Sequence, residues 1–110
     1  MRSVVWDEIS APDMARLREL LGEQLVSSGM EGVYWLELPE RLLSPEQAAH
    51  TGCRPHRVAV IIERGAVRME LLVRSSTSLR CNCTAYATAA QREYLLEFMD
   101  AAIERLKIRT

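Results

Sequence analysis

The dipeptide Arg64-Gly65 constrains this chain more than any other feature, because it lies between two runs of alternating side chains, 56–63 and 66–74. A two-residue loop with glycine at its second position typically joins antiparallel strands, since glycine readily adopts the positive φ of such turns. The loop length then fixes the register and the face of every side chain. The expected opposed pairs are Glu63 and Ala66, Ile62 and Val67, Val60 and Met69, and Val58 and Leu71.

Two further strands extend this hairpin in the prediction. The polar stretch Ser75–Ser78 reads as the next tight turn, followed by a strand over 79–86 that would run beside 66–74. That register opposes Cys81 to Leu71 and Cys83 to Met69, so both cysteines are expected to be buried core residues that react slowly with thiol reagents. The segment 33–38 is rich in β-branched and aromatic residues and completes the sheet.

Three helix starts carry capping signatures, at Ser10, Ser44 and Thr88. They open predicted helices over 11–27, 45–50 and from 88 to about 106, of which the first and last carry broad apolar stripes. One face of the sheet is the surface available to bury those stripes. We therefore predict a single two-layer α+β domain over 1–110, with two long helices on one face of a four-stranded, mainly antiparallel sheet. The expected order is α-β-(short α)-β-β-β-α.

Charge and composition exclude several function classes. The chain has 14 Lys+Arg and 15 Asp+Glu, a formal net charge of −1, which argues against a dedicated nucleic-acid binder. No apolar stretch is long enough to cross a membrane, and the N-terminus lacks the apolar region of a secretory signal. With an odd number of cysteines, these features favour reduced thiols and a cytoplasmic location.

The face of the sheet opposite the helices is predicted to be mixed in character. Three apolar side chains, Trp35, Ile61 and Leu72, lie there among charged ones, and exposed apolar patches usually mark contact sites. The favoured hypothesis is a non-enzymatic interaction or dimerisation module without a cofactor, which binds a second copy or another protein through this face. The expected contact residues are Trp35, Arg57, Ile61, Arg68, Glu70, Leu72 and Arg80.

The alternative hypothesis concerns the segment His50-Thr-Gly-Cys53-Arg-Pro-His56. Thiolate and imidazole are the preferred zinc ligands, so His50, Cys53, His56 and Cys81 form a candidate zinc site. A thiol-based activity that pairs Cys53 with His56 is the other possibility in this loop. The predicted sheet argues against the metal, because His56 and Cys81 would stand two strand spacings apart, about 10 Å.

Overall fold

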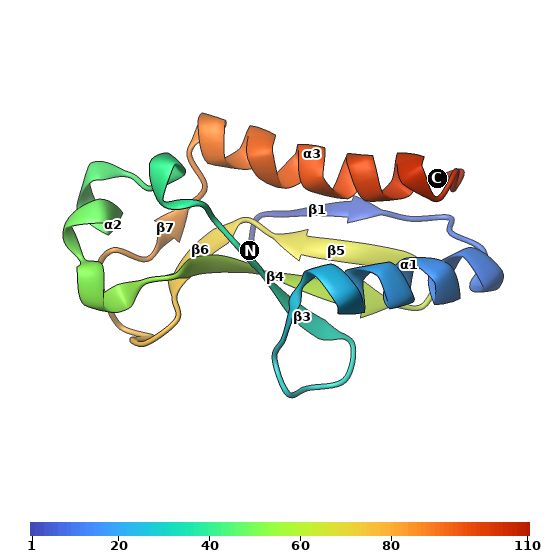
Figure 1. Ribbon diagram of the computed structural model, residues 1–110, viewed down its shortest axis with the longest axis horizontal. Coiled ribbons are helices and arrows are strands. Elements are labelled where there is room, and N and C mark those ends of the chain that lie inside the picture. Colours follow the sequence, from blue (N-terminus) through green and yellow to red (C-terminus); the bar gives the residue numbers. More distant parts are fainter.

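The computed structural model describes residues 1–110 and has an α+β fold with an antiparallel sheet (Figure 1). The predicted fold class is confirmed, but the prediction of four strands is wrong, because the sheet contains seven. The helices are α1 (Ala11–Gln24), α2 (Pro45–Ala49) and α3 (Ala89–Arg105), with short 3₁₀ turns η1 (Glu40–Leu42) and η2 (Thr51–Cys53). The strands are β1 (Ser3–Trp6), β2 (Val26–Ser27), β3 (Val33–Glu37), β4 (His56–Glu63), β5 (Ala66–Glu70), β6 (Leu72–Ser75) and β7 (Ala85–Tyr86).

The central hairpin β4–β5 has the register that its loop predicts. Ile62 opposes Val67 and Val60 opposes Met69, with Gly65 at φ +70° in the turn. Farther from the loop the strand is interrupted at Leu71, which lies between β5 and β6. Strand β6 pairs with the start of β4, so that His56 opposes Ser75. This pairing is displaced by two residues from the expected one, so the predicted opposition of Val58 and Leu71 is wrong. A displacement of two residues keeps every side chain on its predicted face.

Strand β1 lies where the sequence predicted residues 79–86. It pairs with β5 on the side away from β4, so that Val4 and Trp6 oppose Met69 and Val67. Val4 and Trp6 pack against the core and supply the apolar side chains that this position requires. Of the predicted last strand only β7 forms, and it pairs with β6 instead. Residues 76–84 are therefore a loop and not a strand.

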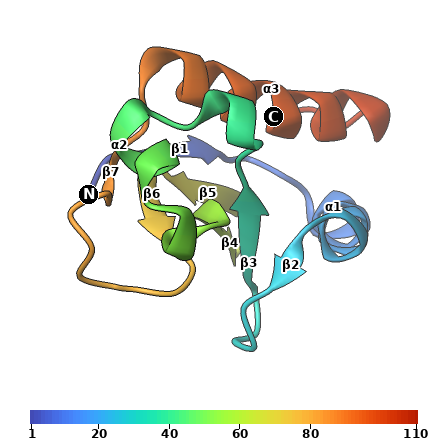
Figure 2. The ribbon, with the colours of Figure 1, turned by 60° about the vertical axis from the view of Figure 1, so that its left-hand side comes forward.

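Helices α1 and α3 run along one face of the sheet and bury their apolar stripes against it (Figures 1 and 2). All three predicted caps form. In the capping boxes of α2 and α3 the side-chain oxygen of the glutamine accepts a hydrogen bond from the backbone N–H of the cap residue. The core includes Leu17 and Leu21 of α1, Leu95 and Met99 of α3, and Val58, Val60, Val67 and Met69 of the sheet. At the end of the sheet away from the Arg64-Gly65 turn, α2, η2 and the 76–84 loop meet (Figure 2).

Candidate metal centre

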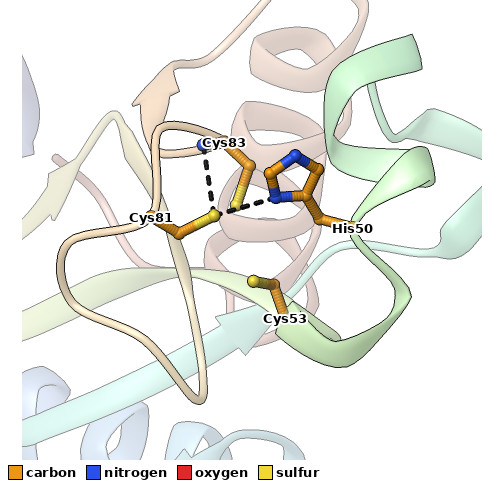
Figure 3. Close-up of side chains that lie close together, drawn as sticks. All are labelled: His50, Cys53, Cys81 and Cys83. Atoms are coloured by element: carbon orange, nitrogen blue, oxygen red, sulfur yellow. Dashed lines mark hydrogen bonds between the residues drawn. The ribbon is translucent and has the colours of Figure 1, made fainter.

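The first half of the site is the turn that follows α2. Ser44 and Gln47 form the capping box that starts this helix, and the chain leaves the helix at His50. The backbone N–H of Cys53 then donates to the carbonyl oxygen of His50 at 3.0 Å, which closes a tight turn. This turn brings the side chains of His50 and Cys53 to the same side of the segment (Figure 3).

The second half is a Cys-x-Cys turn in the 76–84 loop. The backbone N–H of Cys83 points at the Sγ atom of Cys81 at 3.5 Å, and the N–H of Thr84 donates to the carbonyl oxygen of Cys81 at 3.1 Å. The turn therefore places the sulfur atoms of Cys81 and Cys83 close to each other.

The two turns face one another, and their four side chains converge on one point (Figure 3). The ligand atoms of His50, Cys53, Cys81 and Cys83 all lie within 4.8 Å of one another, and His50 Nδ1 lies 2.9 Å from Cys81 Sγ. Sulfur atoms around a tetrahedral zinc ion stand about 3.8 Å apart, because each Zn–S bond is about 2.3 Å long. The four ligand atoms therefore lie close enough that small side-chain movements would bring them to the spacing of a Cys₃His zinc site.

Hydrogen bonds that need no metal hold the first turn in place. Ser75 Oγ donates to the carbonyl oxygen of Cys53 at 3.1 Å, and the N–H of Ser76 donates to the same oxygen at 3.2 Å. Thr77 Oγ1 donates to the carbonyl oxygen of Gly52 at 2.6 Å. The η2 turn is thus fixed to the end of β6, so half of the ligand set is positioned by the fold itself.

Two buried glutamines connect the site to both neighbouring helix starts. Gln91 Nε2 donates to Gln47 Oε1 at 2.9 Å, and Gln47 Nε2 donates to the carbonyl oxygen of Cys83 at 3.3 Å. Gln47 is 2% exposed and Gln91 is fully buried. The capping residues of α2 and α3 therefore also orient Cys83, in the way that residues around a metal site orient its ligands.

The environment shifts the pKa of two of these ligands, Cys53 and Cys83, and of the neighbouring His56. Hydrogen bonds, first from Ser75 and then from Cys81, lower the pKa of the Cys53 thiol to about 7. Burial raises the pKa of the Cys83 thiol to about 12, since the thiolate is costly to desolvate. Burial is also the main cause that lowers the pKa of His56, followed by the nearby charge of Arg54. A cation among these groups would reverse the cost of ionising Cys83.

The structure brings together three of the four predicted zinc ligands, His50, Cys53 and Cys81, and adds Cys83 in place of His56. The prediction that argued against the metal placed Cys81 in a strand, and that placement is wrong, because Cys81 lies in the 76–84 loop with its Sγ atom 2.9 Å from His50 Nδ1. His56 points into the core beside the site, with its Nε2 atom 3.4 Å from Cys83 Sγ. Cys81 is half-buried rather than fully buried, whereas Cys83 is 1% exposed, as predicted.

A spacing signal for Cys83 is present in the sequence. His50-x₂-Cys53 and Cys81-x-Cys83 are two closely spaced ligand pairs, and zinc sites are commonly assembled from two such pairs. The assignment of 79–86 to a strand concealed this signal. In a strand Cys81 and Cys83 would both face the core, whereas in a turn they converge on one point.

The outer-face residues are placed as predicted, with one exception. Arg57 stacks on Trp35, with its guanidinium carbon 4.1 Å from the ring centre, and Arg68 forms ion pairs with Glu63 and Glu70. Ile61 and Leu72 are half-buried on this face. Arg80 is the exception, because it is exposed in the 76–84 loop.

Comparison with known proteins adds no relative: no family, curated protein or solved structure matches this chain. No helix is both long enough and apolar enough to span a membrane. The geometry of the site is therefore the feature from which a function can be inferred.

Proposed function

We propose that this protein is a zinc-binding domain whose ligands are His50 Nδ1 and the sulfur atoms of Cys53, Cys81 and Cys83. The observation that carries the proposal is the approach of these four ligand atoms to within 4.8 Å of one another, from two turns far apart in the sequence. Soft thiolate ligands with one imidazole favour zinc over magnesium or calcium, which prefer oxygen.

The proposed role of the ion is structural. Four protein ligands fill a tetrahedral zinc ion, whereas catalytic zinc sites usually have three protein ligands and an open position for water. The ion would tie the η2 turn to the part of the 76–84 loop that follows Thr77, where residues 78–80 are exposed and Leu79 is 85% exposed. Zinc binding would therefore contribute folding energy to a loop whose one buried side chain is that of Cys83.

Metal content of the purified protein is the direct test. We expect one zinc ion per chain by inductively coupled plasma mass spectrometry, and visible absorption typical of tetrahedral cobalt–thiolate coordination after cobalt replaces zinc. Substoichiometric metal after incubation with zinc and removal of the excess would contradict the proposal. That result would favour the thiol-based alternative at Cys53.

A pair of variants separates ligand loss from a general disturbance of the loop. Cys83→Ser removes one proposed sulfur ligand and should lower the bound zinc well below one ion per chain. Ser78→Ala is the matched control, because Ser78 is exposed in the same loop and its side chain is not a proposed ligand. The control should retain one zinc ion per chain. Equal zinc content in the two variants would argue against Cys83 as a ligand.

Self-association through the outer sheet face is a second proposal, supported by an additional apolar side chain there. Val5 of β1 is 49% exposed and opposes Arg68, so β1 extends the face that holds Ile61 and Leu72. A second copy is the proposed partner, because two-fold dimers are the commonest assemblies. Leu72→Glu should leave the fold intact and convert a dimer to a monomer in light scattering. A wild-type monomer at high concentration would contradict this proposal.

The thiolate ligands also bear on the compartment. Free thiols persist in a reducing environment, so we propose that the protein functions in the cytoplasm.

A further inference from the structure

The three sulfur ligands differ in their access to solvent. Cys53 and Cys81 are half-buried, whereas Cys83 is only 1% exposed. Small oxidants react first with accessible thiolates, since a buried sulfur offers no path of approach. An oxidant that enters this site therefore meets the sulfur atoms of Cys53 and Cys81 before that of Cys83.

The two accessible sulfurs differ in how the rest of the chain holds their backbone. Hydrogen bonds from Ser75, Ser76 and Thr77 to the backbone of η2 hold Cys53 in place without a metal. Cys81 lies in the 76–84 loop, where residues 77–80 are all exposed. The two sulfur atoms lie within 4.8 Å, and a disulfide needs about 2.05 Å. Movement of the part of the loop around Cys81, beyond Thr77, can therefore bring Cys81 to Cys53.

Cys83 has the opposite surroundings. Its carbonyl oxygen accepts a hydrogen bond from the buried Gln47, and its sulfur contacts the fully buried His56. These contacts fix the residue to the core. Cys83 is thus the sulfur least able to move toward a partner.

We propose that the zinc site is a peroxide-sensitive switch, in which hydrogen peroxide joins Cys53 to Cys81 as a disulfide and releases the metal. The inference rests on the proposed function, because it requires zinc on these ligands. The sulfur of one accessible thiolate attacks peroxide, so that an S–O bond forms, the O–O bond breaks and hydroxide leaves. The second thiolate attacks the resulting sulfenic acid, the S–S bond forms and a second hydroxide leaves.

The electrons balance in this sequence. Two thiolates lose two electrons to become one disulfide, and one peroxide molecule gains them to become two hydroxide ions. The zinc ion keeps only His50 and Cys83, and two ligands hold zinc far more weakly than four. The disulfide continues to join the η2 turn to the 76–84 loop after the metal has left, so the oxidised protein keeps its fold.

Peroxide treatment of zinc-loaded protein tests the switch. Zinc per chain is measured first, and hydrogen peroxide is then added in the presence of a chromogenic zinc chelator. Remaining thiols are alkylated, and the bridge is mapped by mass spectrometry without reduction. We expect release of the bound zinc, a loss of two hydrogen atoms, a Cys53–Cys81 bridge and an alkylated Cys83. Dithiothreitol with added zinc should restore one ion per chain.

The outcomes distinguish the two proposals. A chain without zinc before peroxide is added contradicts the proposed function and the switch with it. Zinc that stays bound, a bridge that includes Cys83, or oxidation to sulfinic acid without a bridge contradicts the switch alone. A matched set of variants uses the bridge itself as the readout. Cys83→Ser should still form the disulfide under peroxide, whereas Cys53→Ser and Cys81→Ser should not.

Discussion

The two ends of the central sheet are specified in different ways. At one end the β4–β5 hairpin has its register fixed by a turn of two adjacent residues, Arg64 and Gly65. At the other end His50 and Cys53 meet Cys81 and Cys83, which come from a distant part of the chain. A local turn needs only its own backbone conformation, whereas the second arrangement depends on what the side chains bind. Patterns of neighbouring residues therefore predict structure at the hairpin end. They do not predict it at the site end, where the proposed ion would hold together segments that are distant in sequence.

Zinc removal should produce the largest difference in stability between the two ends of the sheet. If free zinc is about 1,000 times its Kd, binding stabilises the fold by about 4.1 kcal/mol, and a chelator removes all of it. Chemical denaturation with and without a chelator measures this loss. Hydrogen exchange should accelerate in residues 78–84 and remain slow in 58–62, because the hairpin is held by the buried core. Equal acceleration at both ends would show that the metal supports the whole fold.

The fold was predictable where sequence neighbours determine it. The caps at Ser44 and Thr88 and the hairpin register depend on residues close together in the chain, so the sequence pattern predicts them. Strand β1 is absent from the prediction because it is only four residues long and no turn signal joins it to the strand with which it pairs. The predicted strand over 79–86 is too long for the same reason. In the structure β1 pairs with the edge of β5 that this strand was expected to occupy.

The candidate site was only partly predictable, for a related reason. His50 and Cys53 are close in sequence, and their ligand chemistry was recognised. Cys83 was assigned to the core because its burial fits a small apolar residue equally well. Burial and metal ligation coincide at this residue, and only the shape of the 76–84 loop distinguishes them.

Loss of the Gln47 side chain should affect the site end without touching the hairpin. Gln47→Ala leaves the amide of Gln91 and the carbonyl of Cys83 without their buried partner, which costs about 1–3 kcal/mol in unfolding free energy. It should also weaken zinc binding about tenfold, because Cys83 is less well oriented. Denaturant unfolding and competition with a zinc chelator measure the two effects.

Gln24→Ala provides the control for this variant. Gln24 is exposed at the end of α1, so its loss should change stability by less than about 0.5 kcal/mol. If the two variants had the same zinc affinity, the glutamine pair would not support the site.

A substitution in the hairpin turn should lower the stability of the protein without changing its zinc binding. Gly65→Ala places a side chain at φ +70°, a conformation that costs an L-residue about 1–2 kcal/mol. Space is not the obstacle, because the nearest atom to an added Cβ, the carbonyl oxygen of Ile9, is 3.5 Å away. The stability loss should be equal in the zinc-bound and chelated protein. A dependence of this loss on zinc would show that the two ends are coupled.

The smallest expected effect leaves stability unchanged and concerns the thiols of the metal-free protein. The pKa of Cys53 is lowered to about 7, so near pH 7 about half of this group is thiolate, against a few per cent for an ordinary cysteine. Burial raises the pKa of Cys83 to about 12, and this thiol stays protonated and shielded. Iodoacetamide at pH 7 should therefore label Cys53 first and Cys83 last, as followed by peptide mass spectrometry. The rate at Cys53 should fall below pH 6, because protonation removes the nucleophile. Zinc should protect Cys53 from iodoacetamide at every pH at which the ion stays bound. Equal labelling of Cys53 and Cys83 without zinc would contradict the prediction, because it would mean that the site end of the sheet opens in the absence of metal.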